Sequence, residues 1–111
     1  MKFSVHKKNH TTIFNLHETK LDAKIAPMLK AEFLLLCKPK TVKLFILDLS
    51  EVKSADVDGL SALLIAQRVM REHEADLRIA NVHKKTLDLM RASMLEQSFA
   101  IYKTLEEALE E

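Results

Sequence analysis

The sequence predicts an α/β fold in which a mixed β-sheet is covered by about four helices. Segments with apolar residues at every second position alternate along the chain with segments whose apolar residues recur every three or four positions, which are the periods of strands and of helices. The most apolar strand segment, residues 43–49, does not alternate, and such a run is typical of a strand buried on both faces between parallel neighbours. Strands separated by helices favour right-handed crossovers within one sheet.

Length and composition narrow the class of protein. The 111 residues fit one domain, over residues 1–111, and 48% hydrophobic with 30% charged residues are typical of an ordered globular chain. Lysine and arginine together number 17 against 16 aspartates and glutamates, so the net charge gives no support for binding to nucleic acid or to an anionic membrane. Cys37 is the only cysteine, which excludes an intrachain disulfide and a cysteine metal cluster.

The N-terminus and the apolar runs predict a cytoplasmic location. The first residues alternate apolar and polar, whereas a signal peptide has a charged lead followed by an apolar run. The longest apolar runs, residues 33–37 and 62–66, are far shorter than the ~20 residues that a membrane span requires. We therefore expect no direct membrane insertion.

The first half of the chain predicts a hairpin and a helix before the central strand. Residues 2–8 and 11–16 alternate around a short polar turn, which is typical of paired strands. Asp22 is expected to cap the following helix, Pro27 falls in its first turns, where proline is tolerated, and Pro39 ends it. The apolar face of this helix is predicted to consist of Ile25, Met28, Leu29, Phe33 and Leu36.

The second half predicts three more helices and two short strands, which gives the order ββαβαβαβα. They are a helix over residues 58–73, a strand over 77–80, a helix over 84–94, a strand over 99–101 and a last helix after Thr104, with Glu107 at its capping-box position. The sheet core is expected to contain Phe14, Ile46, Leu47, Leu49 and Ile79. The methionines at core spacings are Met28, Met70, Met90 and Met94. The acidic residues expected on a solvent-exposed face are Glu106, Glu107, Glu110 and Glu111.

The most distinctive segment, residues 48–60, joins the central strand to the second helix. In open α/β sheets, functional sites gather at the carboxyl ends of strands, where this segment should lie. Asp56 and Asp58 stand at the start of the helix, where carboxylates cap free N–H groups and meet the positive end of the dipole. The alternatives are a bound hard cation or acid–base catalysis. The sequence has no third acidic ligand at EF-hand spacing for a cation and no Ser–His–Asp arrangement for catalysis. We expect neither an enzyme nor a metal or other cofactor.

Gly59, the only glycine, lies in the first turn of that helix. Its missing side chain predicts either close packing of helix on strand or a docking surface that a partner's backbone approaches. The helix is apolar on its core stripe and also on one flank, which indicates either deeper burial or an exposed patch for a partner. The stripe comprises Leu60, Leu63, Leu64 and Ala66, and the flank Ala62 and Ile65.

The remaining candidate groups favour structural roles. The five histidines are scattered, with no two at i, i+4 on one predicted helix, so we interpret them as isolated surface or turn residues. Cys37 ends an apolar helix face and fits a small hydrophobe. The basic groups, residues 7–8 and 84–85 with Arg91, have no aromatic residues among them, which disfavours nucleic-acid binding.

The central strand, loop and second helix resemble the signature of STAS domains, the anti-sigma-factor antagonist domains of bacteria. The family pattern is a hydrophobic strand that ends in Asp-Leu-Ser, then a few residues, then Asp-Ser-Ser-Gly-Leu. Here residues 45–50 are Phe-Ile-Leu-Asp-Leu-Ser and residues 54–60 are Ser-Ala-Asp-Val-Asp-Gly-Leu. Leu21 and Asp22 match the start of the family's first helix. The resemblance covers the whole chain in length and in order of elements.

The resemblance implies an interaction protein of signal transduction. Family members bind a serine kinase of the histidine-kinase-like ATPase fold that doubles as an anti-sigma factor. Binding frees the sigma factor, and phosphorylation of the first serine after the Asp ends the binding, which is a partner switch in transcription regulation. The matching position here is Val57, and Asp58 replaces the next serine, so the ordinary phosphoswitch is expected to be absent.

Two interpretations of this departure remain. Asp58 is a permanent negative charge that weakens or retunes kinase binding, or Val57 keeps the surface apolar and leaves a constitutive binder; we favour the second. The hydroxyls of Ser54 and Ser61 lie near enough to be modified instead. The expected partner-binding residues are Ser54, Asp56, Val57, Asp58, Gly59, Leu60 and Ser61.

The leading hypothesis is therefore a non-enzymatic protein-binding module for a histidine-kinase-like ATPase anti-sigma factor. The second, which also follows from the resemblance, is a STAS subunit of an ABC-type lipid transporter complex, which needs no phosphorylation. The third is a STAS domain that binds a small molecule or nucleotide. The sequence is compatible with either a monomer or a homodimer.

Overall fold

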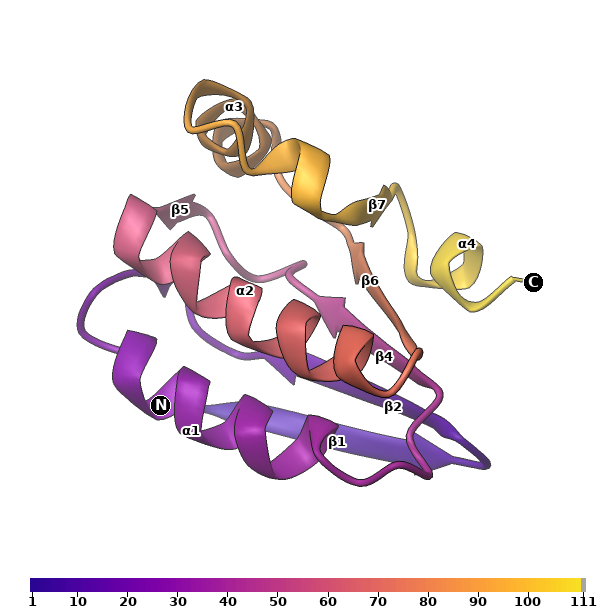
Figure 1. Cartoon of the computed structure of the whole chain (residues 1–111). Coiled ribbons are helices and arrows are strands. Elements are labelled where there is room, and N and C mark those ends of the chain that lie inside the picture. Colours follow the sequence, from indigo (N-terminus) through magenta and orange to yellow (C-terminus); the bar gives the residue numbers. More distant parts are fainter. Residues whose placement is uncertain (111) are drawn as a thin grey trace.

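A five-stranded mixed sheet forms the centre of the computed structural model, which describes residues 1–110 (Figure 1). The strand order is β1-β2-β4-β6-β7. These strands are β1 (Phe3–Lys8), β2 (Thr11–Leu16), β4 (Leu44–Asp48), β6 (Asp76–Ala80) and β7 (Ala100–Tyr102). β1 is antiparallel to β2, and every other pairing in this sheet is parallel. The predicted mixed sheet is confirmed.

The N-terminal hairpin follows from the alternation of its two strands. The register runs from Phe3 opposite Leu16 to Lys8 opposite Thr11, and Asn9 in the turn has a φ of 57°, which asparagine tolerates better than most residues. Because side chains alternate between faces, Phe14 and Leu16 are buried together while Ile13 faces the other side of the sheet.

The central strand β4 is buried on both faces, as its apolar run predicts. It lies between β2 and β6, and both neighbours are parallel to it. Phe45 and Leu47 join the larger hydrophobic cluster, while Ile46 packs with Ala80 and Ala108 on the opposite face.

Four α-helices cover the sheet over residues 1–110. They are α1 (Ala26–Cys37), α2 (Val57–Glu72), α3 (Lys84–Ala92) and α4 (Leu105–Leu109). α1 and α2 lie side by side on one face (Figure 1), and α3 adds Met90 to the same cluster. The short α4 covers part of the other face through Ala108. Thr104 caps α4 as predicted, since its side chain accepts a 3.1 Å hydrogen bond from the Glu107 N–H. Glu106, Glu107 and Glu110 are exposed as predicted, and Glu111 lies outside the described residues.

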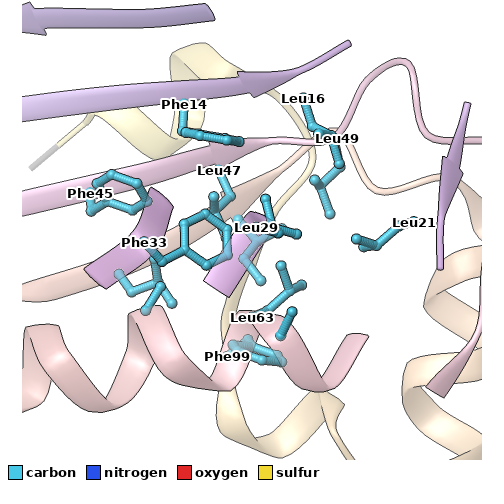
Figure 2. Close-up of a cluster of buried hydrophobic side chains, with 14 of the residues drawn as sticks. Phe14, Leu16, Leu21, Leu29, Phe33, Phe45, Leu47, Leu49, Leu63 and Phe99 are labelled. Atoms are coloured by element: carbon cyan, nitrogen blue, oxygen red, sulfur yellow. The ribbon is translucent and has the colours of Figure 1, made fainter. Parts of the chain in front are cut away.

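The larger core packs aromatic rings between the sheet and α1 (Figure 2). Phe33 of α1 meets Phe14 and Phe45 edge to face, with ring centroids 5.3 and 5.9 Å away, an arrangement that aromatic quadrupoles favour. All five residues predicted for the sheet core are at most 1% exposed. They are Phe14, Ile46, Leu47, Leu49 and Ile79.

Three short elements lie between the predicted ones. β3 (Lys20–Leu21) and β5 (Ser54–Ala55) form a separate parallel pair, and a 3₁₀-helix spans Glu96–Ser98. Elements of two or three residues are too short to show a period of two or 3.6, so periodicity had no means of finding them.

The start of α1 differs from the prediction. The helix begins at Ala26, and its N-cap residue is Ile25, with no side-chain cap. Asp22 instead accepts a 3.1 Å hydrogen bond from the Lys24 N–H, the local bond that aspartate makes in turns. Pro27 does lie in the first turn. Leu29 and Phe33 are fully buried, but Met28 is 46% exposed, because it lies about 100° around the helix from Leu29.

The end of α3 also differs from the prediction. The helix stops at Ala92, two residues before the predicted end, and Met94 has a φ of 61°. This turn directs Met94 outward, where it is 69% exposed, while Met70 and Met90 are fully buried as predicted. No helix within residues 1–110 is long and apolar enough to cross a bilayer.

Candidate functional site

The segment that the sequence singled out lies at the carboxyl end of β4. Leu49 and Val52 are at most 1% exposed and anchor the segment in the core. β5 and the first turn of α2 follow directly. Position at the carboxyl ends of parallel strands matches the usual location of sites in α/β sheets.

The small β3–β5 pair ties this segment to the connection between β2 and α1. The Lys53 N–H donates to the Thr19 carbonyl at 2.8 Å, and the Asp56 N–H donates to the Leu21 carbonyl at 3.1 Å. Two stretches more than thirty residues apart are therefore joined by their backbones, which fixes where α2 begins.

Asp56 is the N-cap of α2, as predicted, and holds two segments together. One carboxylate oxygen accepts from the Gly59 N–H at 2.7 Å, which satisfies a free donor of the first helical turn. The other accepts from the Ala23 N–H at 3.1 Å, in the turn before α1. Both oxygens thus have partners inside the chain.

Gly59 is required by close packing inside the chain. A Cβ at this position would lie 2.1 Å from the Leu21 carbonyl oxygen and 2.7 Å from the Asp22 nitrogen. Both are backbone atoms and cannot move aside as a flexible side chain would. The first of the two interpretations of this glycine, close packing of helix on strand, is confirmed.

The buried carboxylate of Asp48 organises the loop that follows β4. Asp48 is 6% exposed. One of its oxygens accepts from the Ser50 N–H at 3.1 Å and from the Asn81 side chain at 3.0 Å, while the Asn15 amide lies 3.5 Å from the other. Asn15 and Asn81 stand at the ends of β2 and β6, so this polar cluster spans three parallel strands. Pairing with amide donors offsets the desolvation of the carboxylate.

Two of the histidines that the sequence predicts to be isolated contact the same loop from opposite sides. His17 pairs with the side chain of Glu51, and a ring nitrogen of His83 lies 2.7 Å from the Ser50 carbonyl. These two are therefore not isolated, although both lie outside the core as predicted, and His10 makes a similar contact, 3.0 Å from the Thr41 carbonyl oxygen. The sequence alone does not reveal these contacts, because each histidine is far from the loop along the chain. The available signal was position, since each histidine follows a predicted strand.

The part of the site that reaches solvent is smaller than the predicted set of residues. Val57 is 50% exposed, Asp58 is exposed, and Ser54 and Ser61 are half-buried. Asp56 is also exposed, whereas Gly59 and Leu60 are buried beneath. We call the exposed and half-buried set, Ser54, Asp56, Val57, Asp58 and Ser61, the Val57 surface. The carboxylate of Asp58 forms no hydrogen bond or ion pair with any residue in 1–110, so it differs from that of the capping Asp56.

The outward side of α2 continues from the Val57 surface. Ala62 is fully buried, which confirms deeper burial at that position, while Leu64 and Ile65 are half-buried. A shallow groove of about 300 Å³ lies along Leu64, Ile65 and Arg68, with Ser98 on its other side. Within residues 1–110, three or more histidine, cysteine or carboxylate side chains never gather as a metal site would need.

The match to a protein-family model shows which family this chain belongs to. The model of the STAS domain matches residues 2–108, almost the whole chain. The chain belongs to the STAS domain family. Among curated proteins, no sequence matches significantly.

Solved structures share the STAS fold at low sequence identity. An anti-sigma-factor antagonist (STAS) domain protein from Planctomyces limnophilus is 14% identical, with a TM-score of 0.87 over 96% of this chain and 94% of that one. The anti-sigma factor antagonist SpoIIAA of Bacillus, in its unphosphorylated form, is 17% identical, with a TM-score of 0.80 over 97% of this chain and 93% of that one. The murine anion transporter Slc26a9 is 16% identical, with a TM-score of 0.79 over 94% of this chain but only 18% of the transporter.

Proposed function

We propose that this STAS domain is a non-enzymatic, cytoplasmic protein-binding module that acts as an anti-sigma factor antagonist. Its partner is a histidine-kinase-like ATPase that serves as an anti-sigma factor. The partner docks on the Val57 surface, with Gly59 and Leu60 as its buried support. The likeness to SpoIIAA and to the Planctomyces STAS protein supports this class of function.

The observation that carries the proposal is the exposure of Val57. A β-branched apolar side chain that is 50% exposed in the first turn of a helix is not explained by packing, since the core beneath it is supplied by Leu60 and Leu63. An exposed apolar residue on a rigid support is the kind of contact that buries well against a partner. Both ends of the segment are fixed by Asp56 and Asp48, so the surface is preorganised.

The absence of a hydroxyl at Val57 supports constitutive binding. A phosphoryl group carries about −1.5 to −2 charges and would stand between Asp56 and Asp58. Val57 accepts no phosphoryl group, so the apolar contact persists. Asp58 is exposed in the first turn, where the helix dipole stabilises its charge, and we assign it a modest effect on partner choice through rim electrostatics.

The test is a Val57→Asp variant in a binding assay with the isolated partner. The tagged chain is first used to recover partners from a native lysate of the source organism, with identification by mass spectrometry. Val57→Asp should weaken binding about tenfold or more, because a carboxylate is then desolvated in the interface. The melting temperature should stay nearly unchanged, since the side chain is half exposed. Leu109→Asp is the matched control, because Leu109 is 44% exposed and lies on the opposite face of the sheet.

Either of two results would overturn this proposal. Equal losses of binding in Val57→Asp and Leu109→Asp would remove the Val57 surface from the interface. A phosphate on Ser54 or Ser61 of the native chain after incubation with the partner kinase and ATP, seen as a gain in intact mass, would overturn constitutive binding.

A second candidate function is a STAS subunit of an ABC-type lipid transporter complex. Val57 favours it, because a structural subunit needs no phosphoacceptor, and the likeness to one part of Slc26a9 gives an example of this fold within a transporter chain. Recovery of a transporter ATPase with its permease, in place of a histidine-kinase-like ATPase, would select this function. The Val57→Asp assay applies unchanged to that partner.

A further inference from the structure

Helix α1 is apolar on its inward and its outward face. Its inward residues Leu29, Phe33 and Cys37 are fully buried. On the outward face, Met28 is 46%, Leu34 43% and Leu35 70% exposed. Within residues 1–110, these are three of the six large apolar side chains that are exposed. A helix on the surface of a globular protein needs only one apolar face, so the second face is unexplained by folding.

The exposed side chains form one continuous ridge. Met28 and Leu35 are seven residues apart, which is close to two helical turns, and exposed Ala31 lies between them on the same line. Pro27 and Leu34 repeat this spacing on the adjacent line. Figure 1 shows α2 along one flank of α1, and the exposure of Met28, Leu34 and Leu35 places the ridge on the side of α1 that faces solvent. The ridge extends into a shallow hollow of about 250 Å³, lined by Met1 and Phe3 of the N-terminus together with Met28, Ala31 and Glu32.

Lysines lie before, within and after the helical segment that carries the ridge. Residues 24–40 contain four lysines and one acidic residue, Glu32, a local charge of +3 in a chain whose total is +1. The lysines are Lys24, Lys30, Lys38 and Lys40, and all four are exposed. None of them forms an ion pair within residues 1–110. The near-neutral total therefore conceals a positive, apolar face.

We propose that α1 docks the protein on anionic lipid bilayers. The exposed side of α1 combines two features of interfacial helices, apolar side chains and neighbouring lysines, and such helices lie in the membrane plane with the apolar side at the boundary of headgroups and acyl chains. The lysine stems follow the apolar surface while their ammonium groups reach lipid phosphates. Contact is peripheral and requires no spanning segment.

The charge and the size of the ridge favour a lipid bilayer over a second copy of the chain as the surface that α1 contacts. Two copies that meet through α1 would bring two faces of like charge together. The helix has 12 residues, about 18 Å at 1.5 Å per residue, and a face of this length falls well short of the ~800 Å² per partner of a stable interface. A bilayer needs no such area from one helix, since it supplies opposite charge across the whole surface.

Vesicle sedimentation of the full chain tests the proposal. Vesicles of phosphatidylcholine with phosphatidylglycerol should bind the protein, vesicles of phosphatidylcholine alone should bind it at least about tenfold less, and added salt should release it. Met28→Gln combined with Leu35→Gln should lower binding about tenfold, and so should Lys30→Gln combined with Lys38→Gln. All four residues are exposed, so the melting temperature should not change.

Matched controls use residues of similar exposure away from α1. Met94 and Leu109 are 69% and 44% exposed, and Met94→Gln with Leu109→Gln should leave vesicle binding unchanged. Lys85→Gln with Lys103→Gln removes the same number of exposed lysines and should also have little effect. Equal losses in the control pairs, or no preference for anionic vesicles, would overturn the proposal. An α1-dependent dimer in light scattering, or an α1-dependent protein partner in place of vesicle binding, would also overturn it.

Discussion

Helices α1 and α2 lie side by side on the same face of the sheet, yet they relate to solvent in different ways. α2 buries one side, and its start is fixed by the bonds of Asp56 and the close approach at Gly59. α1 has no side-chain cap and exposes apolar residues on its outer side. α2 is therefore fixed in position at one end, where the Val57 surface lies, whereas α1 is distinguished by the apolar residues that it exposes along its length.

Substitution of Gly59 should have the largest effect and would break the fixed start of α2. Gly59→Ala places a methyl group 2.1 Å from the Leu21 carbonyl oxygen, so the helix or β3 must shift. We expect a loss of about 2–4 kcal/mol in the free energy of unfolding, measured by urea denaturation. Ala31→Leu adds a larger group to the exposed side of α1 and should change stability by about 0.5 kcal/mol or less. Similar losses in the two variants would show that the two helices are equally constrained.

The two helices also differ in how well the spacing of their apolar residues predicts them. α2 was predicted within one residue at each end, from residues 58–73 to Val57–Glu72, because its polar residues define the outer side. α1 offers apolar residues in every direction, so the spacing alone could not choose between Met28 and Leu29 as neighbours on the inner face. The prediction that Met28 lies in the core is therefore wrong, since this side chain is exposed.

Substitution of the two aspartates at the start of α2 should lower the free energy of unfolding by different amounts, and this difference is smaller than the effect expected at Gly59. Asp56→Ala removes the cap and the bond to the Ala23 N–H and should cost about 1–2 kcal/mol in urea denaturation. Asp58→Ala removes only a favourable charge near the helix dipole and should cost about 0.5 kcal/mol or less. Equal costs would mean that the capping bonds of Asp56 add nothing beyond its charge.

The candidate site was predictable where its residues are local and missed where they meet through tertiary contacts. Asp56 as a cap required only its position before the helix. The Asp48 cluster required knowledge that β2 and β6 flank β4, since Asn15 and Asn81 are 33 residues away from Asp48 in opposite directions. The Leu21 backbone that excludes a side chain at Gly59 belongs to a two-residue strand without any period.

The ionisation of Cys37 has the smallest expected effect on stability, and the reactivity of its thiol tests the contrast between the two faces of α1. Burial raises the pKa of its thiol from 9.0 to about 12. The folded chain holds this proton more tightly than the unfolded chain, so the thiol's contribution to stability is complete below pH 9 and is lost as the pH rises from 9 towards 12. At pH 7.5, iodoacetamide should label native Cys37 far more slowly than the urea-unfolded chain, because attack requires an exposed thiolate.

The matched control moves the thiol two residues along the same helix. Leu35→Cys in a Cys37→Ala background places a thiol where the native side chain is 70% exposed, and it should react at nearly the same rate with and without urea. Fast labelling of native Cys37 would mean that the inner face of α1 opens readily. The inner face of α1 would then not be stably buried. The two faces of the helix would no longer be distinct, and the outer ridge would not be the one face of α1 available for docking.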